Sequence, residues 1–154
     1  MVSSIVQPAA RWWCGMSLLR QRRFPRSPRS VRAARAFVLE TLTQWGYLDR
    51  HDDVLVCVSE LATNAVLHGV PPGREFSVGV VEGDSLIRIE VRDSGGGDPE
   101  IVRGPAEGCG GRGLRIVSAL ADDFGVTRQN PGKIVWTEFK CGLPAAPEVR
   151  DGSR

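Results

Sequence analysis

Two polar side chains, Glu60 and Asn64, lie four residues apart in the segment SELATNAVLHG, residues 59–69. In a helix this spacing places both on one face, with His68 a further turn along. A carboxylate can accept a proton from a nucleophile, and a carboxamide offers a hard oxygen ligand to Mg²⁺. The same spacing is also typical of a solvated helix face. These residues alone therefore leave a catalytic pair and a surface stripe both open.

A second candidate is Asp93, which follows a β-branched run and precedes the glycines Gly95 and Gly97. A carboxylate at a strand end can accept a hydrogen bond from an exocyclic amine, and glycines let a ligand approach the backbone closely. An adenine-type base fits this pattern. An aspartate that starts a turn after a strand gives the same sequence, so both interpretations stay open.

The third candidate is a glycine-rich stretch, residues 107–113, which runs directly into the apolar segment LRIVSAL. Free amides and the dipole at a helix start favour an anion there. Gly108, Gly110 and Gly113 form a G-x-G-x-x-G string, but the preceding segment is a poor strand, which disfavours a dinucleotide fingerprint. Neither lysine stands in a Walker A position, and the H-R-D loop of eukaryotic-type kinases is missing. Any phosphate site must therefore use another scaffold.

Two helices are predicted to position the first candidate. Apolar residues at three- and four-residue spacing predict a helix that Ser30 caps and Gly46 ends. A second helix is predicted to begin at Asp52 or Asp53 and to end at Gly69, before two prolines. This second helix carries Glu60, Asn64 and His68.

The strands are predicted from alternating, β-branched runs. Residues 75–81 and 85–92 read as one antiparallel hairpin, and residues 124–128 and 133–140 as another. An edge strand is expected around residues 23–25, a long loop over 94–113 and a short helix over 114–120. The expected fold is α+β: a two-layer sandwich with a mixed, mostly antiparallel sheet covered by helices on one face.

Length and composition indicate one globular domain. The chain has 154 residues, 42% of them hydrophobic and 25% charged. No apolar run approaches the roughly 18 to 20 residues that cross a bilayer, and no secretory signal is present. The four cysteines form no C-x-x-C pair, which argues against a zinc or thioredoxin-like site and favours free thiols in the cytoplasm. The domain is expected over 23–141, with a disordered or mis-started extension, 1–22, and a disordered tail, 142–154.

The charge is distributed unevenly. Residues 1–39 carry eight arginines and no acid, whereas the remaining residues carry 12 basic and 18 acidic side chains. The Arg-rich segment 20–35 lacks the interleaved aromatic residues that stack on bases. Nucleic acid is therefore not the expected partner.

Taken in this order, the three segments and the final hairpin resemble the GHKL (Bergerat-fold) ATPases over about residues 24–141. Within that group the chain is most similar to the small bacterial anti-sigma-factor serine/threonine kinases of partner-switching systems, especially the short ATP-binding regulators of actinobacteria. The resemblance implies that the ligands are ATP and Mg²⁺.

The resemblance also implies roles for individual residues. Glu60 would be the general base, Asn64 the Mg²⁺ ligand and Asp93 the contact to the adenine amino group. Gly95 and Gly97 would shape the base pocket, while the lid and phosphate cradle would comprise Gly108, Gly110, Gly111, Arg112, Gly113 and Leu114. The guanidinium of Arg112 would be available to a terminal phosphate. His68 would line the pocket or act structurally at the helix end.

One residue departs from the family pattern. Many relatives have a threonine early in the last strand, as in G-K-T-V-W, where this chain has Ile134. That threonine supports the adenine contact, so the departure predicts a missing hydrogen bond and altered nucleotide affinity. Thr137 lies three residues later, on the opposite face of the strand.

The resemblance implies a protein serine/threonine kinase that phosphorylates an anti-sigma-factor antagonist and is compatible with sequestration of a sigma factor. It is also compatible with a homodimer formed through the face near the first helix. The alternative is a nucleotide-binding docking module with little or no transfer. The ATPase half of a sensor histidine kinase is disfavoured because no membrane segment or phosphoacceptor helix precedes the domain.

Overall fold

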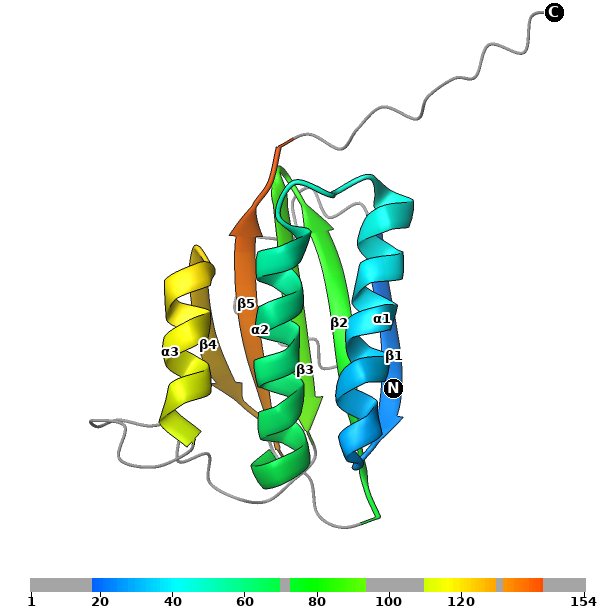
Figure 1. Ribbon diagram of the computed structural model, residues 1–154, viewed down its shortest axis with the longest axis vertical. Coiled ribbons are helices and arrows are strands. Elements are labelled where there is room, and N and C mark those ends of the chain that lie inside the picture. Colours follow the sequence, from blue (N-terminus) through cyan, green and yellow to red (C-terminus); the bar gives the residue numbers. More distant parts are fainter. Residues whose placement is uncertain (1–17, 70–72, 94–109, 130–131, 143–154) are drawn as a thin grey trace, which may run out of the picture.

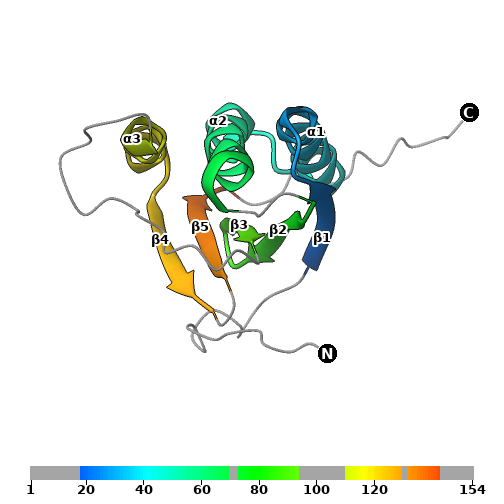
Figure 2. The ribbon, with the colours of Figure 1, turned by 90° about the horizontal axis from the view of Figure 1, so that it is seen from below.

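A five-stranded antiparallel sheet carries three helices on one of its faces in the computed structural model (Figures 1 and 2). The structure describes residues 18–69, 73–93, 110–129 and 132–142. The strand order is β1-β2-β3-β5-β4, and every neighbouring pair is antiparallel. The expected two-layer α+β fold is confirmed, and the described strands contain no parallel pair.

The elements follow one another along the chain in a simple order. They are β1 (Leu18–Pro25), α1 (Pro28–Trp45), α2 (His51–Asn64), the π-helical turn η1 (Ala65–Gly69), β2 (Glu75–Gly83), β3 (Leu86–Asp93), α3 (Gly110–Leu120), β4 (Asp123–Arg128) and β5 (Lys133–Lys140). Both predicted hairpins are confirmed. The edge strand is longer than expected and begins at Leu18, within the segment assigned to an extension, whereas residues 1–17 and 143–154 lie outside the described residues.

Helix α1 begins earlier than the sequence pattern predicted. Its N-cap is Ser27, whose Oγ accepts the backbone N–H of Arg29 at 3.3 Å, and Pro28 occupies the first helical position. The prediction of Ser30 as the cap is wrong because the Ser30 hydroxyl is buried and donates to the carbonyl of Pro25. The predicted end is confirmed: Gly46 has φ 83°, the left-handed cap that glycine adopts most easily.

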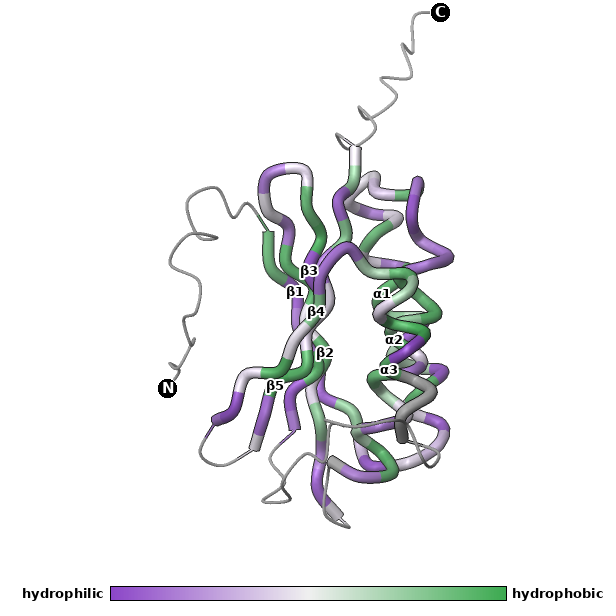
Figure 3. The backbone as a smooth tube through the Cα atoms, turned by 90° about the vertical axis from the view of Figure 1, so that its left-hand side faces the viewer, coloured by the Kyte–Doolittle hydropathy of each residue, from purple (hydrophilic) through white to green (hydrophobic). Residues whose placement is uncertain are grey.

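The core lies between the sheet and the helical layer, which Figure 3 shows from the side. In β3, buried and half-buried residues alternate, so every second side chain faces the helices. The largest fully buried side chains of the sheet are Phe76, Val78, Val80, Ile87, Ile89 and Phe139, and those of the helices are Val38, Leu42, Val54, Val58, Leu61 and Val117. Burial of this apolar area is the main stabilising term of the fold.

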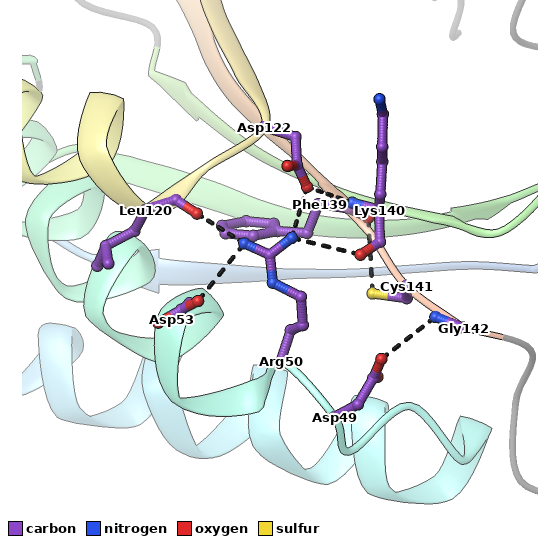
Figure 4. A network of polar contacts seen from close by, with 9 residues as sticks. All are labelled: Asp49, Arg50, Asp53, Leu120, Asp122, Phe139, Lys140, Cys141 and Gly142. Carbon is purple, nitrogen blue, oxygen red and sulfur yellow. Dashed lines mark hydrogen bonds and ion pairs between the residues drawn. The ribbon is translucent and has the colours of Figure 1, made fainter.

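Arg50, at the start of α2, ties three elements together at one end of the molecule (Figure 4). Its guanidinium donates to the carbonyl of Leu120, at 2.8 Å, and to the side chain of Asp122 after α3. It also reaches the carbonyl of Lys140, at 3.3 Å, and lies 5.4 Å from the ring centroid of Phe139 in β5. We call this network the Arg50 clasp. It fixes the beginning of α2 to the ends of α3 and β5.

Candidate functional site

The candidate residues gather at the opposite end of the molecule from the Arg50 clasp. Helix α2 and strand β3 both end there, and α3 and β5 both begin there (Figure 1). Helix α2 packs against α3, and η1 packs against β3. The topology therefore brings together segments that are up to about seventy residues apart in sequence.

Glu60 and Asn64 lie one turn apart in the last part of α2, and both are half-buried. Between them, Leu61 and Ala62 are fully buried in the core. The helix is thus fixed by its apolar face, and the two polar residues lie at the border of that face. This position leaves each side chain partly accessible to a ligand or partner while its backbone is held rigidly.

The sequence pattern predicted a regular α-helix up to Gly69. In the structure, α2 instead widens into the π-helical turn η1 directly after Asn64. Such π-helical turns cost hydrogen-bond geometry and are frequent at functional sites. The carbonyl of Val66 accepts a hydrogen bond from Nε of Arg26 at 2.9 Å, which joins η1 to the end of β1. His68 lies in η1 and is exposed. The residue types of this segment do not predict the wider π-helical turn.

Asp93 ends β3 and is buried, with 5% of its surface exposed. Its Oδ2 lies 2.9 Å from Nζ of Lys133, which is 8% exposed and begins β5. The two residues are register partners, so their side chains lie on the same face of the sheet, the one that the helices cover. Lys133 was not among the predicted site residues. The available signal was that the chain has two lysines among twenty basic residues, and that Lys133 starts a strand.

The predicted effect of Ile134 on nucleotide affinity stays a prediction, and the strand register shows which sheet face this residue occupies. Ile134 is the register partner of Arg92, next to the Asp93–Lys133 pair. Neighbours along a strand point to opposite faces, so the Ile134 side chain lies on the sheet face away from Asp93. A threonine side chain at this position would lie on that same face, away from the Asp93 carboxylate. Thr137 does lie on the helix side, as expected, but opposite Ile89.

Helix α3 starts at Gly110, earlier than the predicted start at Leu114. Gly110, Gly111, Arg112 and Gly113 therefore form its first turn, although their side chains are outside the described residues. Leu114 is 9% exposed and packs in the core, as does Val117. Free amides of the first helical turn and the helix dipole favour an anion at this end of α3. Gly95, Gly97 and Gly108 lie outside the described residues.

The two thiols of the described residues, Cys57 and Cys141, are buried packing groups. Burial raises the pKa of the Cys57 thiol to about 12 and that of Cys141 to about 11. A thiol with so high a pKa carries almost no thiolate at neutral pH. These cysteines therefore supply no nucleophile.

The sequence was compared with families and structures of known proteins. The family model described as the histidine kinase-like ATPase domain matches residues 24–139. The chain belongs to this family. No functionally curated protein matches the sequence.

Two solved structures resemble this histidine kinase-like ATPase domain. A structure of the RsbU and RsbW domains of Rv1364c from Mycobacterium tuberculosis has a TM-score of 0.64 and 20% identity, covering 84% of this chain and 34% of that one. The chain thus spans about a third of the length of that protein chain, and the likeness concerns the fold. A histidine kinase domain from Erythrobacter litoralis EL346 is 31% identical over 59% of this chain and 44% of that one, with a TM-score of 0.46.

The residues of this ATPase domain fit a magnesium nucleotide. Asp93 is a buried carboxylate at the site end of β3, where an exocyclic amine would find an acceptor shielded from water. The described residues contain no group of three or more His, Cys, Asp or Glu side chains that could hold a metal ion. A cation at Asn64 would therefore take most of its oxygen ligands from phosphate and water, as Mg²⁺ commonly does. None of the described helices is long and apolar enough to cross a bilayer.

Proposed function

We propose that this chain is an ATP-dependent protein serine/threonine kinase of the partner-switching type, acting on an anti-sigma-factor antagonist. The observation that carries the proposal is the meeting of three groups at one end of the fold. These are the Glu60–Asn64 pair on α2, the buried carboxylate of Asp93 on β3, and the first turn of α3. Membership of the ATPase family and the motif resemblance support ATP as the phosphoryl donor.

In the proposed mechanism, each residue has a separate task. Asp93 accepts a hydrogen bond from the amine of the base, and the α3 start holds phosphate oxygens through its amides. Asn64 would supply one ligand to a Mg²⁺ ion, and such an ion would supply charge neutralisation for the transferring phosphoryl group. Glu60 accepts the proton of the partner's hydroxyl as the new P–O bond forms and the bond to the leaving ADP oxygen breaks. The docked partner orients that hydroxyl.

Nucleotide binding is tested by titration calorimetry of Mg-ATP with the native protein, Asp93→Asn and the control Asp84→Asn in the exposed β2–β3 turn. A hydrogen bond to a charged group is worth about 1.5 to 3 kcal/mol, so Asp93→Asn should weaken binding by about 10- to 100-fold. Asp84→Asn should bind as the native protein does. Absence of ATP binding to folded native protein would refute the proposed function.

Transfer is tested with Glu60→Gln and radiolabelled ATP on an antagonist protein that presents a serine. Loss of a general base should slow phosphorylation by about 10²- to 10⁴-fold while the affinity for ATP is retained. Glu40→Gln, on the exposed side of α1, is the matched control. Native protein that binds ATP and antagonist but transfers no phosphate would identify a docking module that uses nucleotide as a switch.

A further inference from the structure

The ion pair between Lys133 and Asp93 lies where the proposed function places the nucleotide base, and the inference drawn from it rests on that proposed function. Both residues are more than nine-tenths buried, and Nζ lies 2.9 Å from Oδ2. They come from neighbouring strands whose pairing fixes their positions side by side. A donor and an acceptor are thus presented together at the site end of the sheet.

Burying a lysine destabilises the folded state unless its ammonium interacts with an opposite charge or with hydrogen-bond acceptors. Moving an ammonium out of water costs several kcal/mol, and one ion pair repays this only in part. An ammonium has three N–H donors, and in the described parts of the chain Asp93 is the one charged partner of Nζ. The other lysine, Lys140, ends the same strand and is exposed. The two lysines of the chain thus differ, and the one at the site end of β5 is the buried one.

We infer that Lys133 is a base-specificity residue, whose ammonium donates to a ring nitrogen next to the amine that Asp93 reads. Adenine presents an amine donor at C6 and an acceptor at N1, side by side on one edge. The carboxylate of Asp93 and the ammonium of Lys133 offer the complementary acceptor and donor. Guanine presents a carbonyl oxygen at C6 and an N–H at N1, so the carboxylate would meet an acceptor and the ammonium a donor. The pair consequently selects adenine over guanine.

The side chains next to Lys133 and Asp93 are not placed to donate a hydrogen bond to the ring nitrogen. Arg92 and Ile134 occupy the next register position and point to the other face of the sheet. Arg128 ends β4 and is the register partner of Lys133 on its far side, one strand further from Asp93. Lys133 is therefore the cation whose backbone position adjoins the base-reading carboxylate directly.

The inference is tested by calorimetry with ATP and 1-deaza-ATP, an analogue in which N1 is replaced by C–H. The native protein should bind ATP about tenfold or more tightly than the analogue, the size of one charged hydrogen bond. Lys133→Met should bind both nucleotides equally, near the affinity of native protein for the analogue. Lys140→Met, the control at the exposed end of β5, should discriminate as the native protein does.

Four other outcomes would overturn the inference. Equal binding of ATP and 1-deaza-ATP by the native protein would overturn it. This comparison needs no variant, so it stands even where Lys133→Met fails to fold. Tighter ATP binding by Lys133→Met would mean that the ion pair obstructs the site. If Lys133→Met lost affinity for both nucleotides but still preferred ATP to 1-deaza-ATP, Lys133 would act only in packing. Native protein that binds neither nucleotide would refute the proposed function itself, and the inference with it.

Discussion

Trp136 of β5 shows how closely single residues are fitted on the sheet face away from the helices. The Arg88 guanidinium lies 4.3 Å from the centroid of the Trp136 ring. Gly125 on β4 is the register partner of Trp136. A Cβ added at Gly125 would come within 2.6 Å of the indole ring, a distance that forces the ring to move. The glycine therefore makes room for the indole between two strands.

Gly125→Ala should destabilise the protein by about 1 to 3 kcal/mol, because the indole must leave its position over β4. The measurement is the free energy of unfolding from urea denaturation. Gly79→Ala in β2 is the matched control, since its nearest neighbours would lie 3.9 Å or more from the new Cβ. Alanine there should be neutral or stabilising by up to about 1 kcal/mol, because glycine weakens strand interiors. Equal effects of the two changes would contradict the close fit at Trp136.

The sequence indicated part of the site at this scale. Glu60 and Asn64 could be placed on one helix face because helical spacing is a local property. The contact between Asp93 and Lys133 could not be predicted, because it depends on the register of two strands forty residues apart. Register also decides that Ile134 lies on the sheet face away from Asp93, because a shift of one residue reverses the face of every side chain.

At the scale of elements, η1 is the part of the helical layer that joins the candidate site to the edge of the sheet. It follows Asn64 directly, and Arg26 holds it through the Val66 carbonyl at 2.9 Å. Arg26 also donates its backbone N–H to the carbonyl of Arg74 before β2. The edge strand and the end of α2 are thereby linked through one side chain.

Arg26→Ala should loosen η1 without unfolding the domain. One lost hydrogen bond of about 0.5 to 1.5 kcal/mol should speed local opening by about 2- to 10-fold. Hydrogen exchange measured by mass spectrometry over residues 65–69 would show faster uptake, whereas uptake in β3 would stay unchanged. Arg29→Ala, at an exposed position early in α1, should leave both segments unaffected. Unchanged exchange in Arg26→Ala would mean that η1 is held by packing alone.

Element types were predictable because periodicity and turn residues are strong local signals. The helices, both hairpins and the Gly46 cap agree with the pattern. Serines at residues 27 and 30 both satisfy the capping preference, but Pro28 at the first helical position favours Ser27, and the Ser30 hydroxyl donates instead to the carbonyl of Pro25. The π-helical turn left no signal, because it differs from an α-helix by one residue in a turn and not by composition.

At the scale of the whole molecule, the Arg50 clasp makes stability depend on pH. The backbone N–H of Lys140 and the guanidinium of Arg50 lower the pKa of Asp122. A carboxyl whose pKa is lowered by folding stabilises the native state above its unfolded-state pKa. That contribution is lost as the pH falls through the folded-state pKa.

Asp122→Asn should therefore destabilise the protein at pH 6 and have progressively less effect as the pH is lowered below about 4. The free energy of unfolding from urea titrations at several pH values measures this difference. Asp84→Asn, in an exposed turn, should give a curve parallel to that of the native protein. A constant difference between Asp122→Asn and native protein across the range would contradict a role for the carboxylate charge in the clasp.

The pairing of the first strand with the second has a consequence for synthesis. Pro25 and Glu75 are register partners, so about fifty residues, including α1 and α2, separate the two strands. Chains grow at about 5 to 20 residues per second, so β1 waits roughly 2.5 to 10 seconds before its partner strand is made, whereas helices form in microseconds. The strand made first thus stays unpaired while α1 and α2 are made. Its arginines, Arg20, Arg22 and Arg23, give the unpaired strand a charge that discourages association with other growing chains.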